Sequence, residues 1–176
     1  MRYGRAVAIA VTVALALAGC GGDSPTSPSD LEETVRVGEV SFSVNRASLG
    51  RDFMPIVVNP GPDGGTRLRG TVLVRAANEG QAVAFTVSAK VYDGKHTSYP
   101  VTVVAHDHDQ ETLNPGREVL WPGTIAAGGV QWVELRFTDG PYLPVGSRAA
   151  VVLTWLERGG RTGSMRTAEV EIGGTY

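Results

Sequence analysis

The chain has 176 residues, of which 16 are basic and 18 acidic, so its formal net charge at pH 7 is −2. This balance argues against a nucleic-acid-binding protein, because such proteins are normally basic. The single cysteine excludes an internal disulfide, a redox-active cysteine pair and a zinc site built on several cysteines. The 23 glycines and 10 prolines indicate a chain with many turns.

The amino-terminal segment has the composition of an export signal. Arg2 and Arg5 are followed by an uncharged, mostly apolar run over residues 6–18. A helix needs about 20 apolar residues to span a bilayer, so this run is too short to do so. Its length and its basic flank fit the apolar region of a secretory signal peptide. The sequence therefore predicts an exported protein.

The apolar run ends in the segment Leu17-Ala18-Gly19-Cys20. This segment resembles the lipobox of bacterial lipoproteins, in which small residues precede a lipidated cysteine. The resemblance implies that residues 1–19 are removed, that the Cys20 thiol carries a diacylglyceryl group, and that the new amino terminus is acylated. The next residue is a glycine and not an aspartate, which favours the outer membrane over the inner one where a bacterium has both. The alternatives are an ordinary secretory signal with an accidental cysteine, or an uncleaved anchor.

Residues 20–33 are expected to form a flexible, lipidated tether. Residues 21–33 are rich in glycine, serine, proline and acidic residues and contain one large apolar residue, Leu31. Such a composition buries too little apolar surface to offset the entropy of ordering the chain. The tether is assigned a spacing role, and residues 34–176 form the predicted domain.

Apolar and polar residues alternate along much of this predicted domain, which is the pattern of strands with one buried face. Turn signals such as Asp93-Gly94 separate the runs. Two runs are apolar on both faces, which is typical of central strands covered on both sides: Ser98–Ala105 and Ala149–Leu156. The alternating runs are Glu39–Arg46, Arg67–Ala76, Val83–Tyr92, Val130–Phe137 and Arg166–Ile172.

These runs predict an all-β fold, an immunoglobulin-like antiparallel β-sandwich of about seven to nine strands, with a β-barrel as the alternative. The segments Val72–Gly80, Phe85–Gly94 and Leu113–Gly116 resemble the strand ends and turns of bacterial immunoglobulin-like adhesion and accessory domains. This second resemblance concerns the fold and carries over no functional residues. Three tryptophans are expected in the core or at its rim: Trp121, Trp132 and Trp155.

The densest polar cluster contains two of the three histidines. His106 and His108 alternate with two aspartates, and His96 lies ten residues upstream. If the run is extended, the two imidazoles share one face and could bind Zn²⁺ or Cu²⁺, with His96 as a third ligand from a neighbouring strand. The alternative is a solvated loop after an apolar strand that ends at Ala105.

Two further features are candidate binding surfaces. The long loop 51–66 contains Phe53 and Met54, and a companion loop over residues 139–144 contains Tyr142. The alternative for both loops is a connection that crosses between sheets. Three arginines on one predicted strand face could bind an anionic ligand, or could be ordinary solvated charges: Arg67, Arg69 and Arg75.

Together these features predict a protein of the bacterial cell envelope, attached to the membrane through lipid on Cys20, that acts as a non-catalytic binding module. The expected partner is an envelope protein or a glycan, with no cofactor and no nucleic acid. The sequence contains no nucleophile elbow, phosphate-binding loop or dinucleotide fingerprint. The alternative function is a periplasmic carrier of a small ligand or metal that uses the histidine segment, and a hydrolase comes third.

Overall fold

The structure, a computed structural model, describes residues 31–54 and 60–176. The leader, Cys20 and most of the predicted tether lie outside this part of the chain. Within it there are eleven strands and one short helix, which confirms the predicted all-β class. They are β1 (Thr34–Val37), β2 (Val40–Asp52), β3 (Arg69–Asn78), β4 (Val83–Asp93), β5 (Ser98–Val101), β6 (Val104–Asp107), α1 (His108–Leu113), β7 (Thr124–Ile125), β8 (Val130–Phe137), β9 (Arg148–Glu157), β10 (Thr162–Arg166) and β11 (Val170–Thr175).

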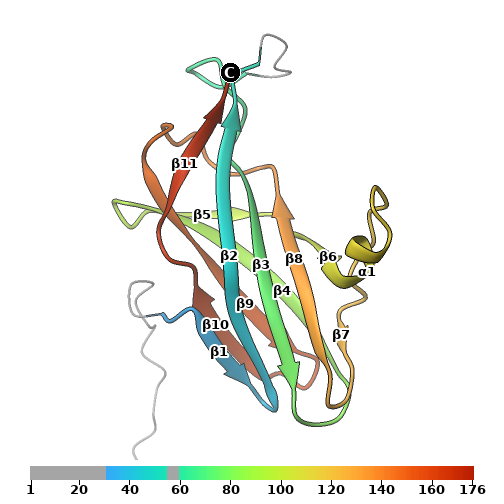
Figure 1. Cartoon of the computed structure of the whole chain (residues 1–176). Coiled ribbons are helices and arrows are strands. Elements are labelled where there is room, and N and C mark those ends of the chain that lie inside the picture. The colour runs from blue at the N-terminus through green and yellow to red at the C-terminus, as the bar shows by residue number, and fades with distance from the viewer. Residues whose placement is uncertain (1–30, 55–59) are drawn as a thin grey trace, which may run out of the picture.

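The strands form two layers that β11 joins into one mixed sheet. The strand order β1-β2-β3-β8-β6 makes one layer, and β5-β4-β9-β10 makes the other, which passes behind it in Figure 1. The first part of β11 pairs antiparallel with β9 through Val170 and Glu171. The rest of the strand, Ile172–Thr175, pairs with β2, and this pairing is parallel. The sandwich is thus antiparallel except along this one seam.

The inward face of each alternating run fills the space between the layers. In β3, Val72, Val74 and Ala76 are buried, while Arg69 and Arg75 face outward and are exposed. The indole of Trp155 stacks on Phe42 with ring centroids 4.1 Å apart and meets Trp121 edge-on at 6.1 Å. Trp121 and Trp155 therefore lie in the core, as predicted, whereas Trp132 faces outward from β8 and is half-buried.

A β-bulge in β2 explains why the predicted strand Glu39–Arg46 covers only part of the observed strand. Val44 pairs with Val74 and Arg46 with Leu73, so Asn45 is an extra residue. The bulge moves the inward positions from even to odd numbers, since Phe42 is buried before it and Leu49 after it. This shift ends the apparent alternation although the strand continues to Asp52.

The prediction of one central strand over Ser98–Ala105 is wrong. The segment divides into β5 and β6, which lie at the two ends of the strand order and in different layers. The chain leaves β5 at Thr102, whose backbone N–H donates to the Asp139 carboxylate at 3.0 Å instead of to a neighbouring strand. Ala149–Leu156 is correctly predicted as central, because β9 lies between β4 and β11 and is almost wholly buried.

The folded part of the chain begins before β1. The Glu33 carbonyl accepts from the Val44 N–H at 2.9 Å, and its carboxylate accepts from the Ala168 N–H at 2.8 Å. The Glu32 carbonyl accepts from the Arg166 N–H at 2.9 Å. Residues 32 and 33, which the sequence places in the tether, are therefore fastened to β2, to β10 and to the segment after β10. No helix among the described residues is long and apolar enough to span a membrane.

Candidate functional site

The two loops predicted as binding surfaces meet at one end of the sandwich. This distal tip comprises residues 53–54 and 60–68 between β2 and β3, residues 138–147 between β8 and β9, and Tyr176 after β11. Figure 1 shows it at the top, at the end of β2 and β11 and away from β1. The first loop joins neighbouring strands of one layer, so the alternative of a crossover is wrong for it. The second loop does cross between the layers.

Arg51 holds the distal tip together from inside. The bulge at Asn45 turns this arginine inward, and only 1% of its surface is exposed. Its guanidinium makes a bidentate pair with Asp63, with Nη1–Oδ2 and Nη2–Oδ1 distances of 2.5 and 2.6 Å. The same guanidinium donates from Nε to the Thr66 carbonyl at 2.7 Å and from Nη1 to the Leu143 carbonyl at 3.0 Å. One buried side chain thus fixes both loops to the end of β2.

The Arg51 pair also sets the ionisation of the loop. The hydrogen bonds from the Arg51 guanidinium hold the pKa of the Asp63 carboxyl at about 2, below its usual 3.8. Burial acts in the opposite direction, and the Gly65 N–H adds a further hydrogen bond that lowers the pKa. Asp63 is therefore charged throughout the neutral and mildly acidic range, and its ion pair with Arg51 persists there.

Aromatic rings surround the arginine on the outside of the distal tip. The Phe53 ring stacks on Tyr176 with a centroid distance of 5.2 Å. The Arg51 guanidinium lies 5.1 Å from the centre of the Phe53 ring and 5.5 Å from that of the Tyr142 ring. The Arg67 guanidinium lies 5.1 Å from the centre of the same Tyr142 ring. Large side chains remain open to solvent, with Met54 50%, Tyr142 37% and Tyr176 81% exposed.

The structure brings together some of the predicted binding residues and separates others. Phe53, Tyr142 and Arg67 belong to one cluster, and Met54 lies beside Phe53 in the chain. Arg69 pairs with Asp52 at the end of β2. Arg75 lies in the lower half of β3, opposite Trp132, and does not belong to the distal tip.

Sequence reasoning missed the residues that organise the cluster. The sequence places Arg51 only at the start of a loop, because its inward orientation depends on the bulge at Asn45. Asp63 lies within the same loop, and the two glycines that follow it are its local signal of a tight turn. Tyr176 gives no signal in the sequence, since its contact with Phe53 depends on the β2–β11 pairing.

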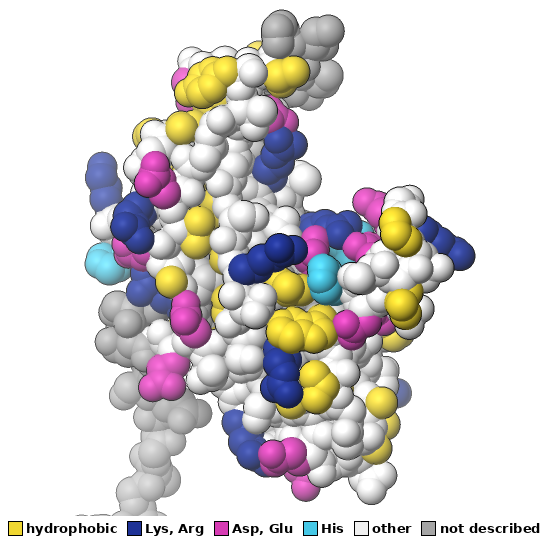
Figure 2. Space-filling model, in the orientation of Figure 1, with side chains coloured by type: hydrophobic (Ala, Val, Ile, Leu, Met, Phe, Trp, Pro, Cys, Tyr) yellow, Lys and Arg dark blue, Asp and Glu magenta, His cyan; other side chains and the backbone are white. Residues whose placement is uncertain are grey.

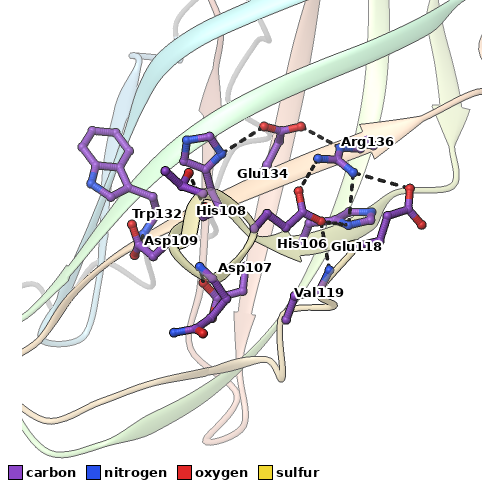
Figure 3. Close-up of polar contacts among 12 residues, drawn as sticks. His106, Asp107, His108, Asp109, Glu118, Val119, Trp132, Glu134 and Arg136 are labelled. Atoms are coloured by element: carbon purple, nitrogen blue, oxygen red, sulfur yellow. Dashed lines mark hydrogen bonds and ion pairs between the residues drawn. The ribbon is translucent and has the colours of Figure 1, made fainter. Parts of the chain in front are cut away.

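The histidine segment does not stay extended. Asp107 ends β6 and caps α1 by accepting from the Gln110 N–H at 3.1 Å, and His108 is the first residue of the helix. The alternative of a loop after Ala105 is also wrong, because β6 continues to Asp107. Figure 3 shows His106 and His108 pointing toward separate carboxylates.

Each of these two imidazoles has an acidic partner. His106 is buried, and its Nδ1 lies 2.8 Å from Glu111 Oε1; His108 Nδ1 lies 3.2 Å from Glu134 Oε2. Arg136 connects the two pairs, with a 2.6 Å contact to Glu134 and a 2.5 Å contact to Glu111 (Figure 3). The network therefore ties α1 to β6 and β8.

Charge pairing outweighs burial in this network. Burial alone would raise the pKa of Glu111, but hydrogen bonds from the Val119 N–H, His106 and Arg136 lower it below its usual value. Burial likewise would lower the pKa of Arg136, while Glu134 and Glu111 raise it. Both groups are thus held in their charged forms.

His96 lies elsewhere. It is exposed in the turn between β4 and β5 with a φ of 62°, and Figure 1 shows this turn on the opposite side of the molecule from α1. The structure thus does not bring His96 to His106 and His108. Across residues 31–54 and 60–176, no group of three or more histidines, cysteines or acids is arranged to hold a metal ion.

No protein-family model and no curated protein matches the chain. The solved structures that are similar to it include two with names. The archaellum periplasmic stator protein FlaG from Sulfolobus acidocaldarius matches over 69% of this chain and 100% of its own, with 13% identity and a TM-score of 0.32. A structure assigned as the ApaA protein from Bordetella pertussis matches over 79% of this chain and 93% of its own, with 14% identity and a TM-score of 0.31.

Proposed function

We propose that the protein is a non-catalytic binding module of the bacterial cell envelope, anchored by lipid on Cys20, that engages a partner protein through its distal tip. The lipobox-like segment supports the anchor and the placement, with the outer membrane favoured where there are two membranes. The distal tip supports the binding role.

The observation that carries the proposal is the exposed aromatic cluster at the distal tip, which Arg51 fastens to the end of β2. Tyr, Phe, Met and Arg are the side chains enriched at the centres of protein interfaces, because each offers a large contact area or several hydrogen bonds. The distal tip presents Met54, Tyr142, Tyr176 and Arg67 together. The pair between the buried Arg51 and the half-exposed Asp63 holds the loops in place before binding, which lowers the entropy lost on association.

The position of the distal tip agrees with this role. The described chain starts beside β1, β2 and β10, while the distal tip lies at the far end of β2 (Figure 1). A module attached through its amino terminus would present the distal tip outward from the attachment point. The aromatic cluster is therefore placed where a partner can reach it.

The binding role is tested by site-specific photocrosslinking in living cells with the full-length chain. A benzophenone amino acid replaces Tyr142 at the distal tip, and in a matched control it replaces Lys90, which is exposed on β4. We expect a discrete crosslinked protein from position 142 that is absent from position 90 and is lost when Tyr176→Ala is added. Equal adducts from both positions, or none from position 142, would overturn the proposal. Adducts that disappear after lysozyme digestion would assign the distal tip to a glycan instead.

The anchor is tested separately with Cys20→Ser. The unchanged chain should incorporate radiolabelled palmitate and sediment with membranes, whereas the variant should do neither. Incorporation of the label by the variant would refute lipidation at Cys20. This outcome is independent of the crosslinking result, so the anchor and the binding surface can fail separately.

A further inference from the structure

A second surface lies on the outer face of β3 and β8, where α1 stands off the sheet. The helix and the sheet enclose a groove of about 510 Å³, the α1 groove, whose lining includes Leu73 on β3, Trp132 on β8 and His108 and Leu113 on α1. Figure 2 faces this side and shows hydrophobic side chains beside a histidine, with Lys or Arg side chains on their other flank. The groove is well below the distal tip and shares no residue with it.

The floor of the α1 groove is apolar where an outer sheet face is normally polar. Leu73 pairs with Glu134 across the strands and Arg75 pairs with Trp132, so Leu73 and Trp132 are diagonal neighbours on the outer face. The bulge residue Asn45 closes one side. Leu113, on the helix, is 73% exposed. An isolated exposed leucine needs no explanation, but one facing a leucine and a tryptophan across a groove marks a contact surface.

The helix that forms the wall is held firmly. The Asp109 carboxylate accepts from the Trp132 N–H at 3.0 Å, which joins α1 directly to the strand that carries the tryptophan. His108 Nδ1 and Glu134 Oε2 add a second link at 3.2 Å (Figure 3). The groove is therefore a fixed feature of the fold.

The charged side chains around the α1 groove differ in whether they already have an ionic partner. Of its acids, Glu134 is paired with Arg136 at 2.6 Å, and Asp109 accepts a hydrogen bond from the Trp132 N–H. Two exposed arginines flank the floor, Arg46 opposite Leu73 on β2 and Arg75 opposite Trp132 on β3. Neither of these arginines forms an ion pair with any part of the chain that the structure describes.

We infer that the α1 groove binds an acidic peptide segment of a partner protein. A large apolar side chain of the peptide occupies the floor on Leu73 and Trp132, and carboxylates beside it pair with Arg46 and Arg75. The floor suits an apolar side chain, because Leu73 and the ring face of Trp132 offer contact area and not hydrogen bonds. Two arginines that pair with no acid of residues 31–54 and 60–176 lie beside this apolar groove and give the charge complementarity that specifies acidic neighbours.

This inference goes beyond the proposed role of the distal tip and does not depend on the lipid anchor. The two surfaces lie on different parts of the sandwich, so one module could hold two partners or two parts of one partner. The α1 groove would recognise acidic residues of the partner, whereas the distal tip offers mainly aromatic contact area.

The test measures binding of fluorescein-labelled synthetic peptides to the full-length protein in detergent, by fluorescence anisotropy at low salt. The probe is Gly-Asp-Glu-Phe-Glu-Asp-Gly. Two matched peptides replace either the four acids by their amides or the phenylalanine by glycine. We expect saturable binding of the probe, and at least about tenfold weaker binding of each matched peptide, which corresponds to about 1.4 kcal/mol.

Protein variants locate the site. We expect Arg75→Gln and Arg46→Gln each to weaken binding of the probe several-fold. The double variant should weaken it about tenfold or more. Both side chains are exposed, so these variants fold; the matched control is Lys95→Gln, an exposed cation on the β4–β5 turn. Trp132→Ala tests the floor, with its circular dichroism spectrum as the check on folding.

Three outcomes would overturn the inference. The probe shows no saturable binding, or Lys95→Gln weakens it as much as Arg75→Gln, or the amide peptide binds as well as the acidic one. Fluorescent dextran sulfate is measured in parallel. Tighter binding of this polyanion than of the probe, with loss in Arg46→Gln and Arg75→Gln, would overturn the peptide assignment in favour of an anionic glycan.

Discussion

The hydrogen bonds of the buried Arg51 guanidinium allow a quantitative prediction about the distal tip. In Arg51→Met the side chain keeps a similar length but cannot donate a hydrogen bond. Four hydrogen bonds are lost, two of them to the carbonyls of Thr66 and Leu143, which have no replacement donor. A buried polar group left unpaired costs about 1–3 kcal/mol, and removal of a charge from water is no longer needed, which offsets part of that loss. We expect the free energy of unfolding to fall by about 2–4 kcal/mol.

The measurement is urea unfolding followed by tryptophan fluorescence, with the slope of the transition checked for two-state behaviour. Hydrogen exchange gives the local result. The Phe53 N–H donates to the Thr175 carbonyl at 2.7 Å and the Thr66 N–H to the Asp52 carbonyl at 2.8 Å, and both amides should lose protection in the variant. The control is Asp63→Asn, which keeps an acceptor at a half-exposed position and should destabilise less. A change below about 0.5 kcal/mol in Arg51→Met, or a larger effect in Asp63→Asn, would refute the assignment of Arg51 as the organising residue.

Three other predictions concern stability. Trp155→Ala should lower the free energy of unfolding by about 3–5 kcal/mol in urea titration, because the indole is fully buried against Phe42; a loss below 1 kcal/mol in the same titration, on the order of a surface substitution, would contradict this. Asp107→Ala should lower the free energy of unfolding by about 1 kcal/mol through the lost cap of α1. Asp107→Asn should keep most of the stability that the cap provides, and unfolding curves of the two variants check both expectations. The Asp63 pair contributes stability that is complete above pH 3.8 and is lost as pH falls through about 2, so acid titration should show this step in the parent chain and not in Asp63→Asn.

The alternation of apolar and polar residues was enough to predict β3, β4 and β8. In these strands the inward positions follow one parity from end to end, as Val133 and Leu135 do in β8. Where the parity changes, the prediction fails. The extra residue Asn45 reverses it within β2, and the run therefore seemed to end six residues early.

Contacts between distant segments account for the remaining differences. The end of β5 is set by Asp139, a residue from another loop, which no local pattern around Thr102 reveals. The chain also has more strands than the seven to nine expected, since β1 and β2 are separated by Gly38 with a φ of 62° and β7 has only two residues. Turn chemistry at such glycines is visible in sequence, but the pairing on either side is not.

The candidate site was foreseen in part. Loop length and aromatic content selected Phe53, Met54 and Tyr142, and the two loops do meet. Their meeting depends on Arg51, whose orientation follows from the bulge. The α1 groove was not foreseen. Only the register of the paired strands shows that Leu73 and Trp132 lie side by side on the outer face, with Arg46 and Arg75 next to them.

The seam made by β11 has a consequence for how the protein reaches its folded state. This strand joins β9 to β2, which come from late and early parts of the sequence, and its pairing with β2 is the one parallel pairing among the described strands. Contacts between residues so far apart in sequence form late, because the loop between them must close first. Until β11 is in place, β2 over Leu49–Asp52 and β9 at Arg148 and Ala149 remain open edges that can pair with other chains, because β1 and β10 cover only other parts of these two sides. An exported chain would therefore pass through its most aggregation-prone stage between translocation and the closing of this seam.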